Sequence, residues 1–264
     1  MKINNFVFTL QKRGYEISDI DLILQGVFNS SYNKSFIKDI DLDSNKVEYV
    51  FNMLEKKYPP SYLAGFVYIR GIKIFVNEDV LIPRTETIEF IYNEIKNKYD
   101  LNNKTVLDLC SGSGVISILL KSIYKESIID AVDISTAALL VSKKSIECNN
   151  LDINVIQSDY FSNINKKYDF IISNPPYIEE ESQEVEAPFE PKIALYSGKD
   201  GLDSYRNIFS DLDEHLNNNG VAFFEIESSN YLNTINLAKD LLRGYTIETY
   251  KDIENKNRYL IIKK

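Results

Sequence analysis

The segment TVLDLCSGSGVISILL, residues 105–120, decides the fold class of this chain. It begins with a short apolar run typical of a buried strand, passes through Gly112 and Gly114, and continues as an apolar run of helical character. A strand that turns into a helix through glycines lets a ligand approach the backbone N–H groups at the start of the helix. The segment therefore predicts a strand, a ligand-binding loop and a helix. A tight turn that binds nothing is the alternative.

Short β-rich runs alternate with helical segments from about residue 104 onward. Ser135 is placed to cap a helix that continues to about residue 149. This alternation predicts a parallel sheet covered by helices on both faces. The last two runs follow each other without a helix, which predicts an antiparallel strand at the sheet edge. The predicted strands are 105–109, 128–132, 153–157, 168–172, 220–226, 245–250 and 259–262.

The first part of the chain has a different pattern, with apolar residues such as Val50 and Leu54 at helical spacing. Pro59 and Pro60 end this pattern, because proline cannot donate to a helix and pushes the residue before it to extended geometry. Two extended runs on either side of Gly71 then predict a β-hairpin. We expect a small helical domain in residues 1–62, a hairpin linker in 63–80 and an α/β domain in 81–264.

Composition narrows the function classes. The 264 residues carry a formal net charge of −9, which repels nucleic acid and favours a basic protein partner. Cys110 and Cys148 have no CxxC spacing and His215 is the one histidine, so we expect reduced thiols and no metal. No stretch approaches the roughly 20 apolar residues of a membrane span, and the first residues lack a secretory signal. We therefore expect a cytoplasmic protein without membrane contact.

The predicted strands that follow the glycine loop end in groups that suit an adenosine. Asp133 ends the second strand, where its carboxylate can accept hydrogen bonds from both ribose hydroxyls. Ser117 stands where a G-x-G-x-x-G fingerprint needs a third glycine, which disfavours NAD. Asp159 and Tyr160 end the third strand, where a carboxylate and an aromatic ring suit adenine. Ordinary packing is the alternative for the ring.

The fourth predicted strand runs directly into Asn174, Pro175, Pro176 and Tyr177. The prolines make this turn stiff. An amide nitrogen is a poor nucleophile because its lone pair is delocalised, so a catalyst must orient the NH2 group and accept from both of its hydrogens. The Asn174 side-chain oxygen and the Pro175 carbonyl are such acceptors, and Tyr177 offers a flat face to a planar group. The turn predicts a site that activates an amide or amino nitrogen by positioning, without a general base; a plain Pro-Pro turn is the alternative.

With these motifs, the chain from about residue 62 to its end resembles the glutamine methyltransferases that modify peptide chain release factors. DNA methyltransferases acting on adenine share the tetrapeptide at 174–177, but the whole combination is more specific. Cys110, Tyr160, Glu227 and Asn230 depart from the residues usual in that family. The resemblance rests on VLIPRTE at 80–86, the glycine loop, Asp133, DYF at 159–161, NPPY at 174–177, FEP at 189–191, AL at 194–195 and GKDGL at 198–202.

The resemblance implies a Rossmann-like class I methyltransferase domain dependent on S-adenosyl-L-methionine in residues 81–264, with substrate recognition by residues 1–62. It implies methylation of the side-chain amide nitrogen (N5) of the glutamine in the Gly-Gly-Gln motif of release factors, and we also expect a monomer. A ribosomal protein glutamine methyltransferase, a nucleic-acid amino-methyltransferase and a non-catalytic binding module are the alternatives. The expected cofactor-binding residues are Asp108, Cys110, Ser111, Gly112, Ser113, Gly114, Asp133, Asp159, Tyr160 and Asn174; the glutamine is expected at Asn174, Pro175, Pro176 and Tyr177, with Asn174, Pro175 and Tyr177 catalytic.

Two further features have open roles in the sequence. The acidic segment 179–186 is either a solvated loop or a surface that meets a basic partner. Arg84 is either a surface residue or a helper near the active site. The residues of the acidic segment that carry the charge are Glu179, Glu180, Glu181, Glu184 and Glu186.

Overall fold

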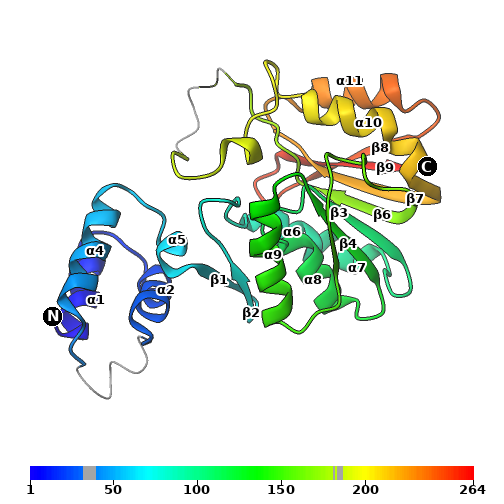
Figure 1. Cartoon of the computed structure of the whole chain (residues 1–264). Helices are drawn as coiled ribbons and strands as arrows, with labels where there is room; N and C mark the ends of the chain where they lie inside the picture. The colour runs from blue at the N-terminus through cyan, green and yellow to red at the C-terminus, as the bar shows by residue number, and fades with distance from the viewer. Residues whose placement is uncertain (32–39, 181, 183–186) are drawn as a thin grey trace. The chain divides into compact units, whose positions relative to one another are not determined.

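The computed structural model describes residues 1–31, 40–180, 182 and 187–264 (Figure 1). The chain folds into two compact units, Met1–Glu78 and Asp79–Lys264. Glu181, Glu184 and Glu186 of the acidic segment lie outside the described residues. Among the helices that the structure describes, none combines the length and apolarity needed to cross a membrane.

The first unit is a group of helices followed by a hairpin. Its helices bury a core that includes Phe6, Leu10 and Val50. Gly26 lets two helices approach closely, because a Cβ at this position would lie 2.2 Å from the backbone oxygen of Ala64. The predicted helical periodicity and the hairpin around Gly71 are confirmed. The elements are α1 (Ile3–Lys12), α2 (Ile17–Phe28), α4 (Ser44–Glu55), α5 (Pro60–Ala64), β1 (Phe66–Ile69) and β2 (Ile72–Phe75).

The second unit contains a seven-stranded sheet in the order β5-β4-β3-β6-β7-β9-β8. The first five strands of this order are parallel, which confirms the predicted parallel sheet. β9 runs antiparallel to both of its neighbours. The strands are β3 (Thr105–Leu109), β4 (Ile128–Asp133), β5 (Asn154–Gln157), β6 (Tyr168–Ser173), β7 (Leu216–Glu225), β8 (Thr246–Lys251) and β9 (Asn257–Lys263).

The predicted antiparallel pairing at the sheet edge is confirmed, but the last strand of the chain is not the edge strand. The last strand, β9, inserts between β7 and β8, so β8 is the edge. The burial of the two strands gives the reason. Residues 259–262 of β9 are all buried, whereas β8 is mostly exposed. An apolar run covered on both faces belongs inside a sheet, and a polar strand suits an edge.

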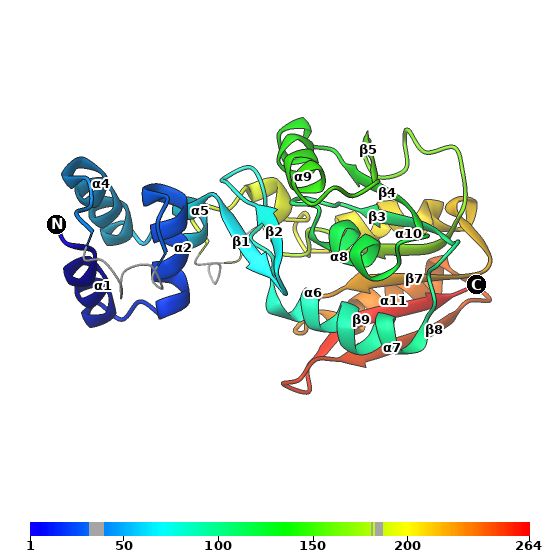
Figure 2. The same cartoon turned by 90° about the horizontal axis from the view of Figure 1, so that it is seen from below.

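Helices cover both faces of this sheet, as predicted. In Figures 1 and 2, α6, α7, α8 and α9 lie on one face, while α10 and α11 lie on the other. The expected cap is also confirmed, because Ser135 Oγ accepts from the Ala138 N–H at 3.2 Å. The helices are α6 (Thr85–Phe90), which continues through a π-helical turn (Ile91–Ile95) into α7 (Lys96–Lys98), α8 (Val115–Ile123), α9 (Thr136–Cys148), α10 (Asp203–His215) and α11 (Tyr231–Leu241).

Candidate active site

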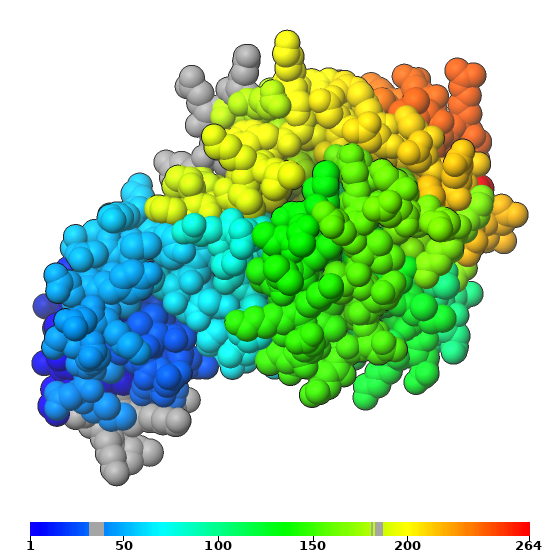
Figure 3. Space-filling view, in the orientation of Figure 1, coloured from blue at the N-terminus to red at the C-terminus, as the bar shows by residue number. Residues whose placement is uncertain are grey.

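The sheet reverses its winding between β3 and β6, because β4 and β5 lie on one side of β3 while β6 and β7 lie on the other. Open α/β sheets bind ligands at such a point, outside the carboxyl ends of the strands. A cavity of about 280 Å³ lies there, lined by the loops after β3, β4, β5 and β6 and by residues from the 193–204 segment. Figure 3 shows the face on which yellow residues of this part of the chain meet the green part of the second unit.

The loop after β3 has an unusual backbone. Cys110 has a φ of 61°, and Gly114 has a φ of 80° at the start of α8. A Cβ at Gly114 would lie 2.5 Å from Ser142 Oγ, so glycine permits the close packing of α8 against α9. Burial raises the pKa of the Cys110 thiol, which keeps it protonated and unreactive. Of the expected cofactor residues in this loop, Cys110, Ser111, Gly112 and Ser113 line the cavity.

Asp108 lies beneath this loop. Its side chain is fully buried. Its Oδ2 atom accepts from Ser111 Oγ at 2.6 Å and from the Ser117 N–H at 3.0 Å. Asp108 is not among the described residues that line the cavity. Asp108 instead ties the loop to the first turn of α8.

We expect Asp108→Asn to change the pH dependence of stability. Burial raises the pKa of Asp108 to about 6, well above the ordinary range of an aspartate, and its Oδ1 atom has no hydrogen-bond partner among the described residues. In the folded state the Asp108 carboxyl keeps its proton to a higher pH than in the unfolded state. The free energy of unfolding of the wild type therefore falls as pH rises from about 4 through about 6, and stays low above that range. The variant escapes this loss, so its stability relative to wild type should increase across that window by on the order of 3 kcal/mol. Urea unfolding at about pH 4 and about pH 7.5 measures the difference, and a difference that stays constant would contradict the expectation.

Asp133 ends β4 and is half-buried in the wall of the cavity. Its Oδ2 atom accepts from the Gly112 N–H at 2.8 Å, and its Oδ1 atom accepts from the Ser135 N–H at 2.8 Å. Burial raises the pKa of Asp133, and these N–H groups oppose the rise. A carboxylate oxygen can accept more than one hydrogen bond, so each oxygen can also accept from a ligand hydroxyl.

Asp159 and Tyr160 line the same cavity from the loop after β5. Tyr160 has a φ of 45°, which is uncommon for a residue with a side chain. Its backbone is therefore held in this conformation by its surroundings. Its hydroxyl donates to Ser204 Oγ at 3.0 Å, and the Ser204 N–H donates to Ser197 Oγ at 2.8 Å. This anchor fixes the position of the aromatic ring in the cavity wall.

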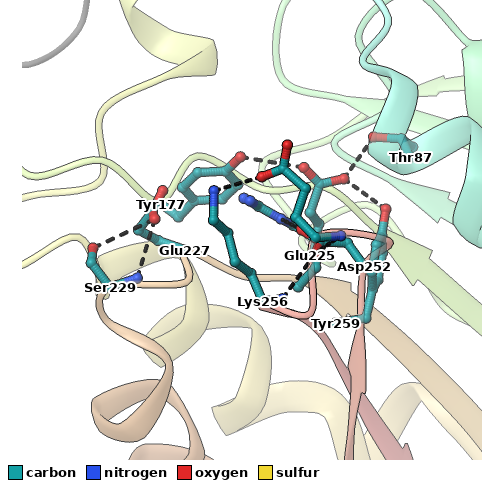
Figure 4. A network of polar contacts seen from close by, with 10 residues as sticks. Thr87, Tyr177, Glu225, Glu227, Ser229, Asp252, Lys256 and Tyr259 are labelled. Atoms are coloured by element: carbon teal, nitrogen blue, oxygen red, sulfur yellow. Dashed lines mark hydrogen bonds and ion pairs between the residues drawn. The ribbon is translucent and has the colours of Figure 1, made fainter.

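The residues of the turn at 174–177 differ in whether they line the cavity. Asn174 and Pro176 line the cavity, whereas Pro175 and Tyr177 are not among its described lining residues. The Tyr177 N–H donates to the Leu195 carbonyl at 3.2 Å, and its hydroxyl donates to Glu225 Oε1 at 3.3 Å (Figure 4). Asn174 therefore belongs to the same cavity as Asp133 and Tyr160, and Tyr177 anchors the turn from behind.

An ion pair that the sequence did not predict joins two segments at the cavity. Arg84 Nη2 lies 2.5 Å from Glu190 Oε2, and Glu190 Oε1 accepts from the Ile82 N–H at 3.1 Å. The Glu190 side chain is 4% exposed and that of Arg84 is 39% exposed. Arg84 itself lines the cavity, so it lies in the wall of the site.

The charges in the cavity wall favour a cationic ligand. Among the described lining residues, Arg84 is the only Lys or Arg side chain. The acidic lining residues are Asp79, Asp133, Asp159 and Asp203. A ligand that carries more positive than negative groups suits this balance.

Comparison with known proteins finds methyltransferases that are similar to this chain in sequence and in structure. The family model of the methyltransferase small domain matches residues 88–189. A release factor glutamine methyltransferase of Streptococcus pneumoniae is 31% identical, over 98% of this chain and 96% of that protein. A ribosomal protein uL3 glutamine methyltransferase of Francisella tularensis is 34% identical, over 72% of this chain and 68% of that protein.

Solved structures agree on the fold. A methyltransferase from Pyrococcus furiosus superposes with a TM-score of 0.58 at 15% identity, covering 84% of this chain and 98% of that one. At this identity the likeness supports the class I fold alone. The near full-length match to the streptococcal enzyme adds the family. The chain thus belongs to the release factor glutamine methyltransferase family, whose members are S-adenosyl-L-methionine-dependent enzymes.

Proposed function

We propose that this enzyme methylates the side-chain amide nitrogen of the glutamine in the Gly-Gly-Gln motif of peptide chain release factors. The observation that carries the proposal is the position of Asn174, which lies in the wall of the same cavity as Asp133 and Tyr160. A side-chain amide that can orient an NH2 group thus lies beside the groups suited to a nucleoside. The near full-length streptococcal relative supports the release factor as substrate.

The residues of the cavity fit S-adenosyl-L-methionine. In this proposal Asp133 accepts from the ribose hydroxyls, Tyr160 and Asp159 border the adenine, and the loop 110–114 faces the methionine part. The cofactor carries a sulfonium, an ammonium and one carboxylate, so its net charge is positive, which suits the acidic wall. When bound, it supplies an electrophilic methyl group.

The residues of the turn would orient the substrate amide. The Asn174 side-chain oxygen and the Pro175 carbonyl accept from the two hydrogens of the NH2 group, which leaves the nitrogen pointing at the methyl group. Transfer would form the C–N bond as the C–S bond breaks, with the electron pair of the broken bond left on sulfur. The nitrogen becomes acidic only as it gains positive charge, so its proton leaves to water without a dedicated base.

In the proposed arrangement the first unit recognises the body of the release factor, and the second unit performs the transfer. An enzyme of net charge −9 attracts basic surfaces on a protein partner and repels the phosphates of nucleic acid. We propose that the enzyme works in the cytoplasm as a monomer, without direct nucleic-acid contact.

Asp133→Ala should weaken binding of S-adenosyl-L-methionine by roughly 1.5–3 kcal/mol, because two ribose hydroxyls lose an ionised acceptor. Calorimetry on the folded variant measures this. Asp152→Ala, which changes an exposed carboxylate outside the cavity wall, is the matched control and should bind normally. An unchanged affinity of the Asp133 variant would remove this residue from the site.

Mass spectrometry of candidate substrates tests the substrate itself. Purified release factor and purified ribosomal protein uL3 are each incubated with the enzyme and the cofactor. A gain of one methyl group on the Gly-Gly-Gln glutamine is the expected result. Methylation of uL3 with an unmodified release factor would instead favour the second candidate, which the 34% identical relative supports.

A further inference from the structure

The carboxylate of Glu225 is the centre of a buried cluster behind the turn at 174–177. Glu225 is the last residue of β7 and its side chain is buried. Three hydroxyl groups donate to it: Tyr177 at 3.3 Å, Thr87 at 2.6 Å and Tyr259 at 2.7 Å (Figure 4). The cluster therefore joins the loop after β6, helix α6 and strand β9 through one side chain.

An acidic group in this position needs a reason, because burying a carboxylate is costly. Burial raises the pKa of Glu225, while the Thr87 and Tyr259 hydroxyls, the Arg258 charge and the Tyr177 hydroxyl lower it. Apolar side chains of similar volume would fill the same space without this cost. A buried polar group with several satisfied partners instead fixes the orientation of each partner.

Tyr177 is held by its backbone as well as by its hydroxyl. Its N–H donates to the Leu195 carbonyl at 3.2 Å, and the Ile178 N–H donates to the same oxygen at 2.9 Å. Gly201 packs against this backbone so closely that a Cβ would lie 2.4 Å from the Tyr177 carbonyl oxygen. These backbone interactions fix where the residue lies, and the bond to Glu225 adds the constraint on the direction of its ring.

We propose that Glu225 is a positioning residue for methyl transfer, which holds the Tyr177 ring so that the neighbouring Asn174 and Pro175 acceptors meet the substrate amide at the productive angle. This inference rests on the proposed function. Glu225 ends β7 and is not among the described residues that line the cavity, so it would act from outside the cavity wall. The reaction needs such a positioning residue, because a transfer that depends on orientation is sensitive to small displacements of the groups that orient the substrate amide.

The cluster offers a matched pair of variants. Tyr177→Phe and Tyr259→Phe each remove one hydroxyl from the same carboxylate, but only Tyr177 belongs to the turn that meets the substrate. Tyr259 stacks on Phe90 with ring centroids 3.5 Å apart, inside the core. A purely structural carboxylate would make the two variants alike in turnover. A positioning carboxylate would make them differ.

The test measures kcat on purified release factor, affinity for S-adenosyl-L-methionine and thermal stability for the full-length enzyme. Tyr177→Phe should lower kcat by roughly tenfold, which is the loss of about one hydrogen bond to a charged group, with unchanged cofactor affinity. Glu225→Gln should lower kcat at least as much. The double variant should be no slower than Glu225→Gln alone, because both changes remove the same contact. Tyr259→Phe should lower the melting temperature and leave kcat intact.

Three results would overturn the proposal: a Tyr177→Phe enzyme with normal kcat, a Tyr259→Phe enzyme as slow as Tyr177→Phe, or losses in the double variant that multiply. Tyr177→Phe keeps the test decisive even if Glu225→Gln fails to fold. Failure of the proposed function has a different signature, because the wild-type enzyme would then leave the Gly-Gly-Gln glutamine unmodified. The same variants would in that case be compared on uL3.

Discussion

Asn174→Ala should lower kcat by about a hundredfold or more, the usual effect of removing one preorganised hydrogen-bonding group from an active site. Asn174 is half-buried at the end of β6 and lies in the cavity wall. Its side-chain oxygen accepts from the substrate amide in the proposed reaction, and alanine has no group to replace it. Steady-state kinetics at saturating release factor and cofactor measure the effect.

The fold should survive this change, because the Asn174 side chain is only half-buried and lies in the wall of the cavity. Asn163→Ala is a suitable control. The Asn163 side chain donates to the Gln157 carbonyl at 2.8 Å at the end of another strand, outside the cavity wall. This variant should keep normal kcat. Near-normal turnover of the Asn174 variant would exclude the proposed role, and a pH–rate profile with an essential base would exclude a base-free transfer.

Removal of residues 1–78 should reduce kcat/KM on intact release factor by about a hundredfold, while the affinity for S-adenosyl-L-methionine stays unchanged. The size of the effect follows from effective concentration, because a tethered recognition unit raises the local concentration of the Gly-Gly-Gln loop by such factors. The cut after Glu78 follows the division between the units. A cut at residue 60 would instead remove α1, α2 and α4 but keep β1 and β2, which belong to the same compact unit as these helices.

A short Gly-Gly-Gln peptide provides the control for this deletion, because it lacks the body of the factor. The shortened and full-length enzymes should methylate the peptide at the same rate. Residues 79–264 contain the whole seven-stranded sheet and its own core, so we expect them to fold alone. If the shortened enzyme methylated the intact factor at the full rate, the first unit would not be the recognition element. Equal losses on peptide and factor would point to damage in the catalytic unit.

The sequence alone determined the elements whose signals are local. The glycine loop, the helix cap at Ser135 and the alternation of strands and helices all depend on residues close together in the chain, and local backbone preferences decide them. The placement of Asp133 and Asn174 on one edge also followed from sequence. Each ends a strand, and the carboxyl ends of parallel strands meet at one edge of a sheet. The relative at 31% identity then supports the reaction class.

The tertiary structure decided everything that depends on which distant segments meet. Glu190 and Arg84 are 106 residues apart, and Glu225 and Thr87 are 138 apart, so neither pair has a local signal. The same holds for the insertion of β9 between β7 and β8, because pairing of strands depends on how both faces are covered. Asp108 shows the limit within a single motif: the resemblance placed it among the expected cofactor-binding residues, and only the tertiary structure showed that its side chain is fully buried and bonded to Ser111. Residues that are neighbours in the chain fix the local backbone conformation, whereas the burial and the partners of a charged group are set by the packing of the whole unit. In this protein that packing separates the groups that face the cavity from those that hold them in place.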